Sequence, residues 1–171
     1  MAAKMQGYRI VARLWPPIDA VTQRDEHRVL PQAIDIECRV AAQVVGALTG
    51  SDFVTLAHDG TYTSNAGDLP AIGPAGGALV PILGVVMWDE GTKTAGQHCW
   101  VRVLGFHPYA KIDGSGTGVA INDALMAAAS GKSNKLTNAG LMCAVALAAV
   151  TSDSYGKVLL ADPLGVLTGL A

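Results

Sequence analysis

Turn-forming residues interrupt this 171-residue chain so frequently that long helices have no room to form. Clusters rich in glycine, proline, asparagine and aspartate recur roughly every 8–14 residues, for example at positions 65–68, 73–77 and 113–118. No segment with helical periodicity extends beyond about 12 residues. Short segments between frequent turns are typical of all-β domains, so the sequence predicts a small antiparallel β-barrel or sandwich.

Alternating apolar residues identify the strands within this pattern. In residues 97–106, Cys99, Val101 and Val103 occupy alternate positions, which places them on one face of a strand. Residues 33–42 show the same period of two. Because such alternation is typical of a strand with one face buried, both segments are predicted to be strands that contribute one face to the core.

The first 32 residues differ in composition from the rest of the chain. Charged residues are concentrated there, and Trp15-Pro16-Pro17 excludes a regular helix and favours extended backbone. We therefore divide the chain into an extended N-terminal arm, residues 1–32, and a β-rich domain, residues 33–171. Exposed Trp and Pro on such an arm suit docking against another subunit, whereas an arm folded back on its own core is the alternative. The residues predicted to contact a partner are Trp15, Pro16, Pro17, Leu30 and Pro31.

The composition indicates a surface that is partly covered by partners. Hydrophobic residues make up 50% of the chain and charged residues only 15%, whereas a typical soluble domain is about 25% charged. Binding to nucleic acid normally requires a basic surface, and the net charge of -2 gives no indication of one. The longest apolar run, residues 141–150, is too short to span a bilayer, and residues 1–7 do not resemble a signal peptide. We expect no nucleic-acid or membrane partner and a cytosol-like compartment.

Each candidate catalytic or metal-binding motif in the sequence departs from its required pattern at a position that can be named. The GKS sequence at 131–133 resembles the end of a phosphate-binding loop, but Met126 stands where that loop requires glycine. His98 and Cys99 are adjacent in a predicted strand, so they point to opposite faces and cannot easily share one metal. The three cysteines are widely spaced, which favours buried free thiols over a disulfide framework. We expect no catalytic residue, no cofactor and no metal, and therefore a chain that is not an enzyme.

The order of features over residues 96–165 carries a family resemblance. The strand WVRVLGF at 100–106 is followed by VAINDAL at 119–125, by AVALAAV at 144–150 and by GKVLL at 156–160. This succession resembles the capsid decoration (cement) proteins of tailed bacteriophages. In that family a strand ending in glycine leads to a G-D-x-L turn, an Ala-rich strand and a final Gly-x-Val-x-Leu strand. Here the G-D position reads Asn-Asp, which is a departure from the pattern.

The resemblance implies a small β-barrel or tulip-like domain that forms a homotrimer on the outer capsid and has no catalytic activity. Its partners would be further copies of itself and the major capsid protein, on a shell assembled in the host cytoplasm. Its function would be to stabilise that shell. Two alternatives stay open: another phage structural subunit, such as a tail-tube, head-completion or spike-base protein, and a small β-barrel enzyme or ligand binder.

Overall fold

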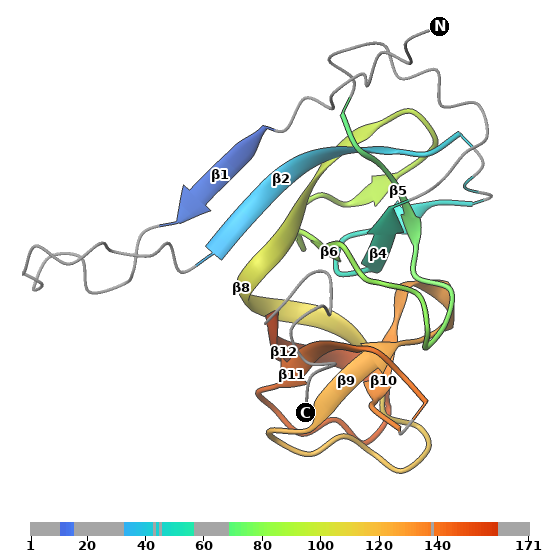
Figure 1. Ribbon diagram of the computed structural model, residues 1–171, viewed down its shortest axis with the longest axis vertical. Helices are drawn as coiled ribbons and strands as arrows, with labels where there is room; N and C mark the ends of the chain where they lie inside the picture. The colour runs from blue at the N-terminus through green and yellow to red at the C-terminus, as the bar shows by residue number, and fades with distance from the viewer. Residues whose placement is uncertain are drawn as a thin grey trace, which may run out of the picture.

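The computed structural model describes residues 11–15, 33–42, 44, 46–56, 69–137 and 139–160, and these form a mainly β structure (Figure 1). This confirms the predicted all-β class. The strands are β1 (Ala12–Trp15), β2 (Ala33–Val40), β3 (Leu48–Thr49), β4 (Phe53–Leu56), β5 (Ala71–Pro74), β6 (Gly84–Val86), β7 (Thr92–Lys93), β8 (His98–Asp113), β9 (Ala124–Ala127), β10 (Ser133–Lys135), β11 (Met142–Ala146) and β12 (Asp153–Leu160), with a 3-10 turn at Ala129–Gly131.

Ten of these strands form one mixed sheet in the order β1-β2-β5-β4-β6-β8-β10-β9-β11-β12. The additional pairing β2–β8 closes one ring of strands, β2-β5-β4-β6-β8, and the pairing β8–β12 closes a second ring, β8-β10-β9-β11-β12, so the two rings share β8. Strands β3 and β7 form a separate pair. Most neighbours are antiparallel, as expected, but β2–β5 and β8–β10 are parallel. A parallel pair needs a long crossover, and the chain supplies one in each case by inserting other strands between the partners.

The sixteen-residue strand β8 organises the whole structure. Its first half pairs with β2 and β6, and its second half pairs with β12, so it runs through both halves of the molecule in Figure 1. The strand bends near Gly105, whose φ of 99° lies in the left-handed region that glycine adopts without strain. Pro108 falls where β8 has two residues opposite one of β12, between the pairs Val158↔His107 and Gly156↔Ala110. This bulge accommodates a residue that cannot donate a ladder hydrogen bond.

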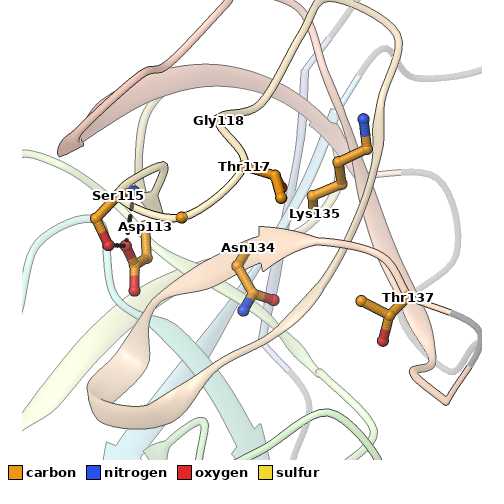
Figure 2. Close-up of a pocket in the computed structure, with 8 residues that line it drawn as sticks. Asp113, Ser115, Thr117, Gly118, Asn134, Lys135 and Thr137 are labelled. Atoms are coloured by element: carbon orange, nitrogen blue, oxygen red, sulfur yellow. Dashed lines mark hydrogen bonds between the residues drawn. The ribbon is translucent and has the colours of Figure 1, made fainter.

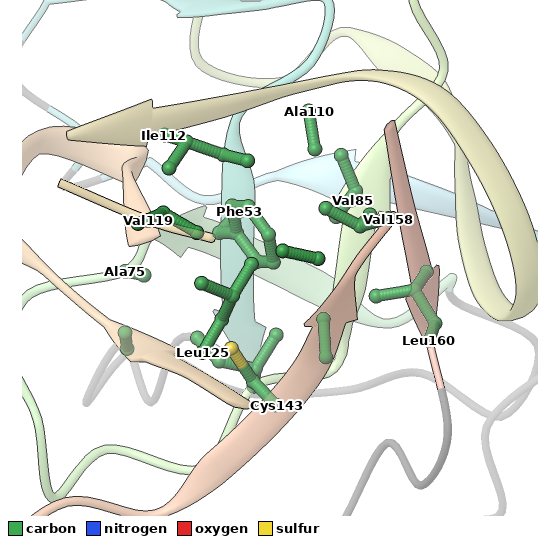
Figure 3. Packing of buried hydrophobic residues seen from close by; sticks show 14 of the residues in the cluster. Phe53, Ala75, Val85, Ala110, Ile112, Val119, Leu125, Cys143, Val158 and Leu160 are labelled. Carbon is green, nitrogen blue, oxygen red and sulfur yellow. The ribbon is translucent and has the colours of Figure 1, made fainter. Parts of the chain in front are cut away.

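Two hydrophobic clusters share β4 and β6 as a common wall. Phe53 and Val85 point into the larger cluster, whereas the next residues along the same strands, Val54 and Val86, point into the smaller one. Successive strand residues face opposite sides, so β6 and the first half of β4 are buried on both faces. The larger cluster (Figure 3) consists of Phe53, Ala75, Ile82, Val85, Ala110, Ile112, Val119, Leu125, Ala127, Cys143, Ala144, Ala146, Val150, Val158 and Leu160.

A partly buried polar contact joins the turn before β4 to β8. The ammonium of Lys111 in β8 donates to the carboxylate of Asp52. It also donates to the hydroxyl of Thr49, at a distance of 2.5 Å. Asp52 also accepts the Thr49 backbone N–H at 2.7 Å, and the N–H of Lys111 donates to the Ser51 carbonyl at 3.1 Å. These bonds hold the turn before β4 against the second half of β8.

Candidate interaction surface

A row of apolar side chains crosses three strands on the side of the sheet that faces away from the core. Val145 of β11 lies opposite Leu159 of β12, and Leu159 lies opposite Phe106 of β8. Directly opposed residues share a face, and the strand neighbours Val158 and Leu160 point into the larger cluster, so this row points outward. Leu159 is 41% exposed and Phe106 is 43% exposed. We call Val145, Leu159 and Phe106 the apolar row.

Exposed aromatic side chains also gather around Trp88. Its indole meets the ring of Tyr109 edge-on, with centroids 6.3 Å apart, and both side chains are substantially exposed. Trp, Tyr and Phe are the residues that most often anchor protein interfaces. The exposed aromatics and the apolar row are therefore the candidate interaction surface of the described residues.

A row of charged side chains crosses the strands on the other side of the bend in β8. Asp35 of β2 is fully buried, and Arg102 of β8, directly opposite, donates to it from Nε at 2.8 Å and from Nη2 at 3.2 Å. The remaining Nη1 of Arg102 donates to the carbonyl of Phe106 at 2.6 Å, which braces the bend. A bidentate pair with this extra bond satisfies most of the polar atoms that burial removes from water.

Arg13 extends this row into the N-terminal arm. It lies opposite Asp35 in the β1–β2 register, and its Nη2 is 3.3 Å from the second carboxylate oxygen. The guanidinium carbon lies 3.9 Å above the ring centroid of Trp100, close enough for a cation–π contact. We call Arg13, Asp35 and Arg102 the charged row, and Asp35, Trp100 and Arg102 the Arg13 socket.

His107 is fully buried beneath the Trp88 ring. Its Nε2 lies 3.1 Å from the carbonyl of Val86, and its Nδ1 accepts the backbone N–H of Tyr109 at 3.3 Å. An imidazole that accepts at Nδ1 carries its single proton on Nε2 and is therefore neutral. Burial is the main reason that the pKa of His107 falls to about 4. The ring acts as a structural hydrogen-bonding group that secures β8 to β6.

A polar cleft of about 320 Å³ opens between the 113–118 loop and β10 (Figure 2). Asp113 and Lys135 bring opposite charges to its rim, but each already has a partner. Asp113 accepts from the N–H of Ser115 at 3.0 Å and from its hydroxyl at 2.5 Å, bonds that lower the pKa of the carboxyl group. Lys135 forms an ion pair with Asp123 at 2.9 Å. The cleft therefore offers hydrogen bonds, and its lining contains neither cysteine nor histidine.

The three cysteines are free and buried, as predicted. Burial raises the pKa of the thiols of Cys99 and Cys143 to about 12 and raises that of Cys38 as well. Such thiols stay protonated at neutral pH and are poor nucleophiles and metal ligands. His98 is exposed while Cys99 is buried, which confirms that they point to opposite faces. Within the described ranges, no group of three or more His, Cys, Asp or Glu residues could hold a metal ion.

The predicted partner-contact residues are only partly placed. Trp15 ends β1 and pairs with Ala33, so this part of the arm lies along its own sheet. Pro16, Pro17, Leu30 and Pro31 lie outside the described residues. The sequence reasoning missed both rows. An available signal was the presence of charged Asp35 and Arg102 in the middle of alternating strands, where they needed partners on the same face.

Comparison with known proteins adds no family to these observations: no protein-family model matches the chain, and a search of curated proteins finds no match. In the part of the chain that the structure describes, no helix has the length and apolar character needed to cross a bilayer. The interpretation of the site therefore depends on its geometry. The geometry consists of an outward apolar row, a cluster of exposed aromatics and an arm strand attached through a charged socket.

Proposed function

We propose that this chain is a non-enzymatic virion structural protein, a decoration protein that forms a homotrimer and binds the outside of a phage capsid. The observation that carries the proposal is the apolar row, because Phe106 and Leu159 lie opposite each other on neighbouring strands and both are exposed. The likeness of residues 96–165 to capsid decoration proteins supports the same function. In this function the major capsid protein is the second partner.

Shell stabilisation by such a protein requires apolar area and repetition rather than reactive groups. Covering the apolar row with another subunit removes hydrocarbon surface from water at about 25 cal/mol per Å². A trimer then presents three equal contact sites to a shell, and three weak contacts together bind far more tightly than one. The low charge of the chain fits this mechanism, since few ionic groups would have to be desolvated at the contacts.

The test measures oligomeric state and capsid binding for the original chain, Phe106→Glu and a control. We expect a trimer by light scattering that sediments with expanded capsids, and a Phe106→Glu variant that is folded but largely monomeric and unbound. Ile121→Glu is the matched control, because Ile121 is 59% exposed and lies outside the apolar row. A strictly monomeric chain that does not bind capsids would refute the proposal. Rings of six or twelve copies in electron micrographs would instead favour a tail-tube or head-completion subunit.

A further inference from the structure

The edge of β2 is divided between two strands. One edge of β2 pairs with β8 along its length, from Ala33 to Arg39. On the opposite edge β5 pairs only with Arg39 and Val40, and β1 covers Ala33–Ile36. β1 is the terminal strand of the large sheet. The backbone of β1 therefore pairs with the sheet along one edge only, as does a strand that a second chain adds to the edge of a sheet.

The socket that receives Arg13 is built from the body of the domain. Arg102 holds both oxygens of Asp35, and Trp100 presents its ring from the same strand as Arg102. All three residues of the socket belong to β2 and β8, so none of them is supplied by β1. The socket is therefore preorganised for an extended segment that carries a guanidinium opposite Asp35, since it offers a carboxylate oxygen at 3.3 Å and an aromatic face at 3.9 Å.

We propose that β1 is an exchangeable strand: in the assembled protein the β2 edge of one copy is filled by residues 11–15 of a second copy, whose Arg13 enters the Arg13 socket. This inference rests on the proposed assembly function and names the contact through which one copy completes another. The occupant is a second copy because β1 already has the register and the charge that the edge accepts. Exchange keeps every contact of the closed form, so it costs little and adds a physical link between subunits.

The length of the connection permits this exchange. Positions 16–32 separate β1 from β2, and an extended chain of that length spans about 55–60 Å. Adjacent antiparallel strands usually need a loop of only two to five residues. Two prolines follow β1 directly, and the residue before each proline is biased toward extended backbone. The covalent connection therefore does not require β1 to pair with the β2 of its own chain.

Site-directed cross-linking distinguishes the two arrangements. Because Glu37 N–H donates to the Val11 carbonyl at 2.8 Å, the next pair in the register, Ala12 and Ile36, is a non-hydrogen-bonded pair, the type of pair in which opposed backbones lie closest and a disulfide can be introduced. Chains that carry only Ala12→Cys, with a large tag, are refolded together with chains that carry only Ile36→Cys, untagged. Mild oxidation is followed by a non-reducing gel. We expect a covalent heterodimer that neither variant forms alone.

The doubly substituted chain, Ala12→Cys with Ile36→Cys, is the folding control. Refolded at high dilution, it should close an intramolecular disulfide and run as a monomer, which shows that both positions still pair. If that disulfide forms but the mixed chains give no heterodimer, the arm stays on its own sheet and the proposal is wrong. Light scattering on the same samples keeps this result separate from the proposed function, because trimers without cross-chain disulfides would contradict exchange alone.

The contribution of the socket is tested by changing Arg13. Arg13→Ala in the tagged chain should slow heterodimer formation roughly five- to tenfold, the effect of losing one half-exposed ion pair and one cation–π contact. Arg13→Lys keeps the charge but loses the planar group, so an intermediate rate is expected. Equal rates for all three chains would show that Arg13 does not direct the strand to this edge.

Discussion

The charged row and the apolar row each include a residue of β8, but they differ in how far their side chains are exposed to solvent. In the charged row, Asp35 and Arg102 are covered and satisfied within the chain. In the apolar row, Phe106 and Leu159 remain exposed. Only four positions separate Arg102 from Phe106, and the bend at Gly105 lies between them. The polar groups of the charged row therefore stabilise the fold, whereas Phe106 and Leu159 leave apolar surface in contact with water.

Removing the carboxylate of the charged row should have the largest effect. Asp35→Ala leaves Arg102 buried without its counter-charge, and we expect a loss of about 3–5 kcal/mol in the free energy of unfolding, measured by urea denaturation. The double variant Asp35→Leu with Arg102→Met removes both charges and should recover much of that loss. A single variant as stable as the original chain would show that the charged row does not stabilise the fold.

Acidification should weaken the attachment of β8 to β6 at His107. The pKa of His107 is about 4 in the folded chain and about 6.5 when unfolded, so the unfolded chain binds the extra proton first as pH falls. Stability from this group is complete above pH 6.5 and decreases by about 3 kcal/mol as pH falls to 4. His107→Gln does not titrate, so its stability should depend less on pH over this interval. If the free energy of unfolding depends on pH equally in both proteins, His107 is not the group whose protonation destabilises the fold.

Changing the apolar row should have the smallest effect on stability. Phe106→Ser alters an exposed side chain, so we expect the free energy of unfolding to change by less than about 1 kcal/mol. Association should nevertheless weaken, because the same change removes an aromatic anchor from the surface. Urea denaturation and light scattering on one preparation measure both quantities. A large loss of stability would show that Phe106 belongs to the core of a single chain.

Local sequence patterns predicted the strands but not how they meet. The alternation at residues 97–106 correctly placed Cys99 and Val101 in the core, because side-chain direction in a strand follows directly from position. The frequent turns correctly indicated an all-β class. The register between β2 and β8 is a long-range property, however, so the pairing of Asp35 with Arg102 had no local signal that named the partner.

The apolar row was hidden from sequence reasoning for a related reason. Phe106 continues an apolar stretch, and only the glycine bend and the bulge at Pro108 determine which of its neighbours points inward. The parallel pairings of β5 and β10 likewise depend on crossovers that local periodicity does not encode. Predictions about Pro16, Pro17, Leu30 and Pro31 concern residues outside the described ranges and stay predictions.

The wall formed by β4 and β6 has a consequence for how the molecule unfolds. Phe53 and Val85 serve one cluster while Val54 and Val86 serve the other, so neither cluster can open without exposing apolar residues of the second. The two halves of the described structure should therefore lose amide-exchange protection together, in one cooperative event. A fragment that begins at β8 would lack both wall strands and would leave the larger cluster without its central phenylalanine.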